Sequence, residues 1–156
     1  MNHFSNSKTI FQDSVSPACG AEASIMKQRS SSILTQYLHE TRQWERALDY
    51  YKQENSYLKT WLSELVDNHS GEVFVAMAEY YNNRFLAADD YIKVFVQDLK
   101  VQSRQIAQLQ QARINAGLKL NNRQLQLRKE MEFFEKDMTR LRVEFTSKML
   151  NYLDPA

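Results

Sequence analysis

Apolar residues recur at alternating intervals of three and four along most of this 156-residue chain. Such spacing places them on one face of an α-helix, and three runs follow it, over about 34–65, 74–109 and 127–152. No segment alternates apolar and polar residues over any length, as a half-buried strand does. Three glycines and two prolines also supply few of the turns that a sandwich, a barrel or a wound α/β fold needs. The sequence therefore predicts an all-α protein.

The expected architecture is an antiparallel, up-down-up three-helix bundle with long, coiled-coil-like helices. We expect the helices over about 32–67, 71–116 and 121–152, within a bundle that occupies 31–156. Residues 1–30 are rich in serine and have no sustained apolar period, which predicts a mostly disordered tail.

The junction near Gly117 decides the topology. Gly117 is a good helix stop, and Asn121 with Gln124 resembles a capping box at the start of a new helix. Leu120 and Leu127 nearly continue the spacing of the second run, so one unbroken helix of about 80 residues is the alternative. We favour the hairpin. Its first helix would be longer than the one before it, so the hairpin is expected to project beyond the start of that helix.

The charges are unevenly distributed, although the net charge is only +1. Residues 34–98 hold eleven acids and six bases, whereas 99–129 hold seven bases and no acid. In the hairpin these bases gather at the tip, near Lys27 and Arg29, as a candidate anion-binding surface. The simpler interpretation is a solvated helix surface, because no aromatic residue is present in 99–129 to stack on nucleotide bases. The seven candidates are Lys100, Arg104, Arg113, Lys119, Arg123, Arg128 and Lys129.

Several aromatic and polar residues do not fit a simple apolar seam. Aromatic doublets at 50–51, 80–81 and 133–134 cannot all face one seam, so one member of each lies on a flank. Flank aromatics either widen the core or form a patch for another helix. The candidates for such contacts are Tyr57, Trp61, Tyr80 and Phe133.

On the seam itself, Asn55 either is buried and fixes the helix register or lies near the surface and is hydrated. Gln102 marks the start of a thinner core, which we expect to open more readily than the aromatic middle.

The sequence predicts no catalytic, cofactor or metal site. Cys19 is the lone cysteine, which excludes a disulfide framework and a multi-cysteine zinc site. None of the three histidines is the second member of a Glu-x-x-His pair, and three glycines cannot build a phosphate-binding loop. No stretch approaches the roughly 20 apolar residues of a membrane span, and the first residues do not resemble a signal peptide. We therefore expect a non-enzymatic protein of the reducing cytoplasm.

Two segments resemble parts of small, uncharacterised all-helical bacterial proteins of unknown function. They are Trp44-x3-Leu48-x2-Tyr51-Lys52-x-Glu54-Asn55-x2-Leu58-Lys59 and Phe134-Glu135-Lys136-Asp137 with the later Leu141 and Phe145. The resemblance covers about two helices and implies a helical bundle in a bacterial cytosol, without an activity, a cofactor or a residue role.

Two functions are consistent with these features. The first is a non-catalytic bundle that acts through protein–protein contacts, as a scaffold or adaptor or by self-association, so that its partner is another protein or a second copy. The alternative is a binder of nucleic acid or another anionic surface through residues 99–129.

Overall fold

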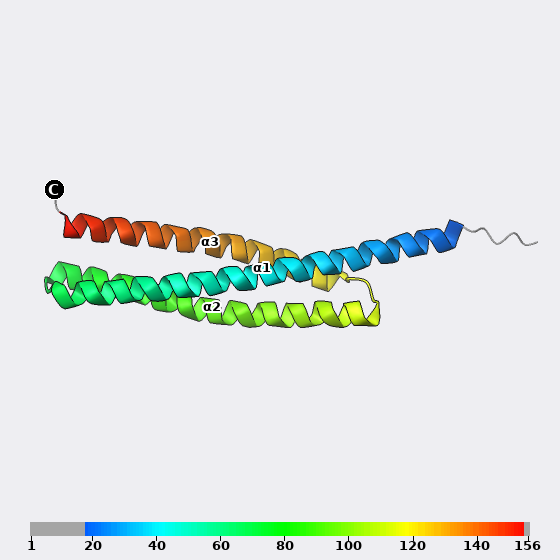
Figure 1. Cartoon of the computed structure of the whole chain (residues 1–156), viewed down its shortest axis with the longest axis horizontal. Coiled ribbons are helices and arrows are strands. Elements are labelled where there is room, and N and C mark those ends of the chain that lie inside the picture. The colour runs from blue at the N-terminus through cyan, green and yellow to red at the C-terminus, as the bar shows by residue number, and fades with distance from the viewer. Residues whose placement is uncertain (1–17, 155–156) are drawn as a thin grey trace, which may run out of the picture.

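The structure is a computed structural model that describes the backbone of residues 18–154, and their side chains except at positions 18, 19 and 30. Within these residues it contains three helices and no strand: α1 (Ala18–Asn68), α2 (Glu72–Ala112) and α3 (Leu118–Leu153). They run up, down and up along one elongated bundle (Figure 1). The predicted all-α three-helix bundle is confirmed, with a hairpin between α2 and α3 in place of one continuous helix.

The α2–α3 turn begins at an arginine. Arg113 follows α2 with φ 55° and ψ 37°, the left-handed conformation in which a helix commonly ends. The N–H of the next residue, Ile114, donates to the carbonyl of Leu109 at 3.0 Å, which satisfies one of the free carbonyls at the end of α2. Gly117 has extended φ and ψ (−83° and 170°) and precedes α3 as its N-cap. The predicted helix end near 116 is too late, because Arg113 and not Gly117 stops α2. The predicted start near 121 is also too late, because Gly117 is the N-cap of α3.

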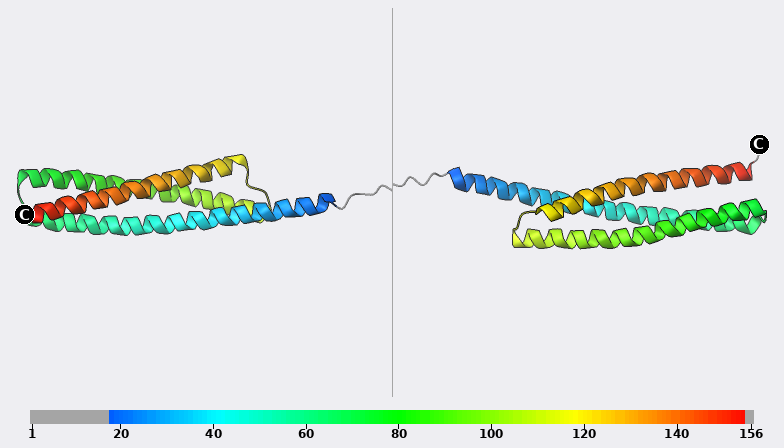
Figure 2. Two further views of the ribbon diagram at one scale, coloured as in Figure 1. Left: turned by 90° about the horizontal axis from the view of Figure 1, so that it is seen from above. Right: turned by 180° about the vertical axis from the view of Figure 1, so that it is seen from behind.

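The start of α1 also differs from the prediction. Residues 18–30, assigned from the sequence to a disordered tail, are helical, whereas 1–17 lie outside the described residues. The physical reason is that extending an existing helix costs little once the packed part beyond Leu34 has formed its first turns. Because α1 has 51 residues and α2 has 41, the start of α1 projects beyond the α2–α3 turn (Figures 1 and 2). The predicted projection of the hairpin is thus reversed.

The main core contains a cluster of aromatic side chains. Phe85 and Phe145 are fully buried and meet edge to face, with ring centroids 5.1 Å apart. The ring of Trp61 lies 5.3 Å from that of Phe145 in a similar geometry, and the ring of Tyr81 lies 5.2 Å from it. Large rings at the seam positions bury much more apolar area than aliphatic side chains would, so they supply a large share of the stabilisation of this core.

Asn55 joins α1 to α2 inside the core. Its side chain is fully buried, so the hydrated alternative is wrong. Its Nδ2 donates to the carbonyl of Phe85 at 2.8 Å and to Oδ1 of Asp89 at 2.6 Å, and Asp89 also pairs with Lys59 of α1. These bonds form at one alignment of the two helices, because a shift along the axis would leave the buried amide without partners.

Candidate functional site

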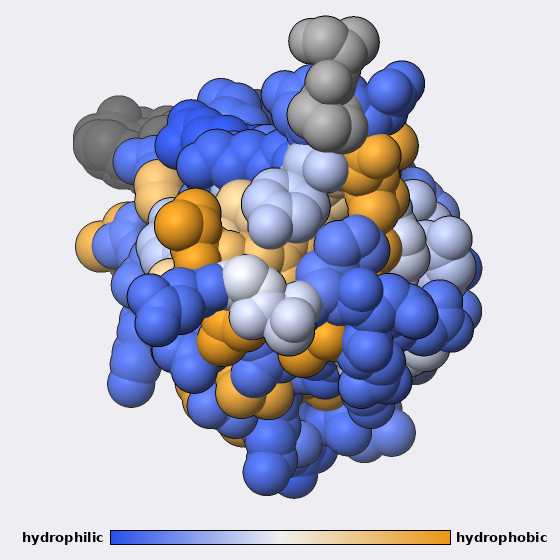
Figure 3. Space-filling model, turned by 90° about the vertical axis from the view of Figure 1, so that its left-hand side faces the viewer, coloured by the Kyte–Doolittle hydropathy of each residue, from blue (hydrophilic) through white to orange (hydrophobic). Residues whose placement is uncertain are grey.

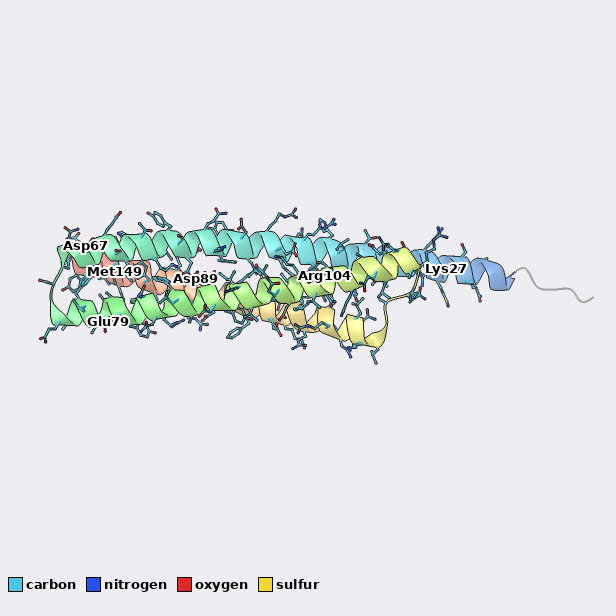
Figure 4. All side chains as sticks on the ribbon, turned by 90° about the horizontal axis from the view of Figure 1, so that it is seen from below. Lys27, Asp67, Glu79, Asp89, Arg104 and Met149 are labelled. Carbon is cyan, nitrogen blue, oxygen red and sulfur yellow. The ribbon has the colours of Figure 1, made fainter. Side chains whose placement is uncertain are left out.

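Positive charge is concentrated where the start of α1 meets the α2–α3 turn. We call residues 18–42 and 99–129 the basic end; they hold ten bases and two acids. Lys27 lines a hollow with Arg113 and Leu34, which brings the α1 extension next to the turn as predicted for Lys27. In Figure 4, Lys27 and Arg104 lie toward this end of the bundle, and Asp67 and Glu79 lie at the other. The chain is therefore a rod with oppositely charged ends.

Two of the seven predicted anion-binding bases are neutralised by neighbouring helices. Arg128 bonds both carboxylate oxygens of Glu40 on α1, at 2.6 and 2.9 Å, and Arg123 lies 3.1 Å from Asp98 on α2. Burial raises the pKa of Glu40, but the hydrogen bonds from Arg128 and Gln124 and the charge of Arg128 outweigh it, so the pKa lies below its usual value. These two arginines therefore stabilise the bundle.

The other bases of the basic end are all exposed. There are eight of these bases, and none makes an ion pair with any residue in 18–154. Five of the eight belong to the predicted set. The eight are Lys27, Arg29, Arg42, Lys100, Arg104, Arg113, Lys119 and Lys129. Because their charge is not compensated locally, the field outside this end of the rod is positive.

A layer of polar side chains crosses the core next to the basic end. Thr41, Gln102 and Gln124 are fully or almost fully buried, and each comes from a different helix. Nε2 of Gln102 donates to Oε1 of Gln124 at 3.0 Å, and Nε2 of Gln124 donates to Glu40 at 2.9 Å. We call these three residues the polar layer. It separates the main core from a smaller apolar cluster, which contains Leu34, Ile106 and Leu120.

The four predicted interaction aromatics do not gather into one patch. Tyr57 on α1 and Phe133 on α3 are 69% and 72% exposed, whereas Trp61 is half-buried against Phe145. Tyr80 is half exposed, and its hydroxyl accepts a hydrogen bond from Arg84 at 3.0 Å. The aromatic doublets therefore divide as expected, with one ring buried or half-buried (Tyr51, Tyr81, Phe134) and the other exposed on a flank.

Phe133 belongs to a surface that sequence reasoning missed, along the open side of α2 and α3. With Tyr91 and Ala87 it lines a hollow between these two helices, and a second hollow of about 750 Å³ lies further toward the α2–α3 turn. The second hollow is lined by Val101 and Leu118, among others. We call this surface the groove face. Ion pairs between Arg84 and Asp137, at 3.6 Å, and between Arg123 and Asp98 cross it.

The groove face also carries bases along α3. Lys119 and Asn122 line the second hollow, and positions seven residues further on stay on the same side of a helix packed in this way. This places Lys129 and Lys136 in line with Asn122, and Arg140 in line with Phe133. Lys119, Lys129, Lys136 and Arg140 are all exposed, and none pairs with an acid among the described residues. The seven-residue spacing of these bases is visible in the sequence. It assigns them to the groove face only when the side of α3 that faces α2 is known.

The opposite end of the rod is closed by a small aromatic cluster. His69 follows α1, and its Nδ1 lies 2.9 Å from the carbonyl of Leu65. Its ring contacts those of Phe74 and Tyr152, with centroids 5.2 and 5.9 Å away. Apolar side chains are visible between polar ones on this end (Figure 3), where Val73 and Leu150 are exposed.

Neither metal ligands, nor a membrane span, nor a likeness to known proteins assigns a function to the described residues. Among the side chains that the structure describes, no three of His, Cys, Asp or Glu come together in a way that could hold a metal ion. None of the described helices is long and apolar enough to cross a membrane. No family model, curated protein or solved structure matches the chain. The groove face and the basic end are therefore the two candidate functional surfaces among the described residues.

Proposed function

We propose that this chain is a non-catalytic helical-bundle protein of the cytoplasm that acts through protein–protein contacts, as a scaffold or adaptor or by self-association. The groove face carries the proposal. Phe133 is 72% exposed beside Ala87 and Tyr91, so a large ring and its apolar neighbours face solvent in a groove between two helices. A lone cysteine is consistent with a reducing compartment.

A partner helix in this groove would gain most from Phe133. Burying a phenylalanine side chain contributes about 1.5–3 kcal/mol, and exposed aromatic residues in pockets are common anchors of protein interfaces. The four bases on the same face would favour an acidic partner and disfavour a basic one. The groove face therefore combines an apolar anchor with a charge preference.

The test compares two matched substitutions. Phe133→Glu alters the groove face, whereas Leu86→Glu alters an exposed apolar residue in line with Glu79 and Lys93, which line hollows between α1 and α2. In affinity capture from the native host, we expect partners that bind the wild type and Leu86→Glu but not Phe133→Glu. If all three proteins retain the same partners, or if none retains a partner and none self-associates, the proposal is wrong.

A second candidate function is binding to nucleic acid or another anionic surface through residues 99–129. The exposed, unpaired bases of the basic end support it, because each phosphate contact releases a counterion and makes binding sensitive to salt. We expect Arg104→Gln, Arg113→Gln and Lys119→Gln together to lower retention on heparin and on duplex DNA. A control with Arg46→Gln, Lys52→Gln and Lys93→Gln removes as many exposed bases outside this end. Equal retention of the two triple variants would contradict the assignment.

A further inference from the structure

We propose that the groove face of one copy binds the outer face of α1 of a second copy, so that copies join side by side. This inference rests on the proposed function, since it names the partner of the groove face. It follows from two surfaces of the same chain that complement each other in charge and in apolar content.

Over residues 47–68 the outer face of α1 is acidic and carries two exposed rings. Tyr50, Tyr57 and Glu64 are spaced by seven residues, so they lie on one side of α1, and all three are exposed. Asp49 and Asp67 are exposed as well, and neither pairs with a base among the described residues. Few apolar side chains on this helix protrude as far as Tyr57, which is 69% exposed. Over residues 47–68 this face therefore offers aromatic area beside three unpaired acids and one exposed base, Lys52, whereas the exposed Arg42 and Arg46 precede this stretch.

The groove face has the opposite character. Phe133, Tyr91 and Val94 supply exposed apolar area, and Lys129 and Lys136 lie three to four residues from Phe133 along α3. The acids nearest the groove, Asp98, Glu130 and Asp137, are already paired with arginines of the same chain. A docked acidic helix would therefore meet unpaired bases around an apolar centre, which is the pattern of a helix-in-groove contact.

The positions of the two faces decide what kind of assembly results. In a three-helix bundle the groove between two helices lies across the bundle axis from the third helix, so the groove face and the outer face of α1 point in opposite directions. The contact is then heterologous, because each copy uses one face for the preceding copy and the other face for the next. Such contacts continue unless a ring closes, so the assembly grows beyond a dimer.

The first experiment measures mass against concentration by light scattering at low salt. We expect the average mass of the wild type to rise past that of a dimer as concentration increases, and to fall when salt screens the charges. Phe133→Glu and Tyr57→Lys should each remain monomeric under the same conditions, whereas Leu86→Glu should assemble like the wild type. Circular dichroism confirms that each variant keeps its helix content, and Phe133→Ser and Tyr57→Ser replace any variant that does not.

Mixing the two variants gives the decisive result. Phe133→Glu keeps an intact outer face of α1, and Tyr57→Lys keeps an intact groove face, so together they retain one complete contact. An equimolar mixture should form a 1:1 dimer and nothing larger. A mixture that stays monomeric while the wild type assembles would overturn the pairing of these two faces.

Two other outcomes separate this inference from the proposed function. A wild type that stays monomeric at every concentration overturns self-association, but it leaves the proposed function standing if Phe133→Glu still loses a host partner. If the wild type forms a closed dimer that Tyr57→Lys does not disrupt, the outer face of α1 is excluded as the segment that occupies the groove face. If Phe133→Glu keeps both self-association and partner capture, that result contradicts the inference and the proposed function together.

Discussion

The polar layer allows a sharp test of how the core of this rod is stabilised. Gln124 is fully buried, and its side chain accepts from Gln102 at 3.0 Å and donates to Glu40 at 2.9 Å. Replacing Gln124 with leucine removes these two bonds and the longer ones, at 3.4 Å, from its Nε2 to the carbonyl of Tyr37 and to Oγ1 of Thr41. It leaves the Gln102 amide with only its 3.4 Å contact to the carbonyl of Leu120. A buried polar group without a good partner costs about 1–3 kcal/mol, so Gln124→Leu should destabilise the fold.

The double substitution should behave differently. When Gln102→Leu and Gln124→Leu are combined, no unpaired amide is left at this level, and two apolar side chains join the main core to the smaller cluster around Ile106. Replacing both partners of a buried polar pair by apolar groups is nearly neutral or stabilising. The coupling between the two positions should therefore be about 1–3 kcal/mol, in the direction that makes the double variant more stable than the sum of the single variants.

Chemical denaturation followed by circular dichroism measures all four proteins of this cycle. We expect Gln102→Leu and Gln124→Leu each to shift the midpoint to lower denaturant with little change in slope, and the double variant to return to or exceed the wild-type midpoint. If the two single losses simply add in the double variant, the hydrogen bond between the two amides is not what the layer contributes.

Four further predictions follow from single features. Phe145→Ala should destabilise the fold by about 3–5 kcal/mol in thermal or chemical unfolding, because the ring is fully buried among other aromatics. Arg113→Gly should raise the free energy of unfolding by roughly 0.5–1 kcal/mol, because glycine adopts a left-handed φ without strain; a loss would contradict this. The pKa of Glu40 is lowered, so its contribution is present above the unfolded value near 4.5 and is lost as pH falls through the lower folded value. The stability difference between wild type and Glu40→Gln should therefore shrink on acidification, and a constant difference would refute the ion-pair interpretation. Amide hydrogen exchange should be faster around Leu34 than around Phe85, since the smaller cluster buries fewer apolar side chains.

Spacing alone was sufficient to predict most of the fold. Most seam positions are buried or half-buried, including Asn55 and Gln102, because a three-four repeat leaves one side of each helix for the core; Tyr152 at the end of the third run is exposed. Helix ends were less predictable. Arginine seldom adopts the conformation of Arg113, so nothing in its residue type marks a helix stop, and residues 18–30 are helical without any apolar seam of their own.

The candidate site was only partly predictable for a related reason. Phe133 was singled out as a flank aromatic, and the bases of 99–129 as a cluster. Lys136 and Arg140 were not, because their role depends on how α3 is rotated about its axis relative to α2. Arg123 and Arg128 were counted as available although Asp98 and Glu40 neutralise them, since these acids come from distant parts of the sequence. Pairing between helices is a tertiary property that composition does not reveal.

An odd number of antiparallel helices has a mechanical consequence. Ala18 and Leu153 lie at opposite tips of the structure, and α1 alone has 51 residues, about 76 Å at the usual rise per residue (Figure 1). Two molecules tethered to these positions would be held apart at a nearly fixed separation, as by a stiff strut. A bundle with one more helix would instead bring them to the same tip.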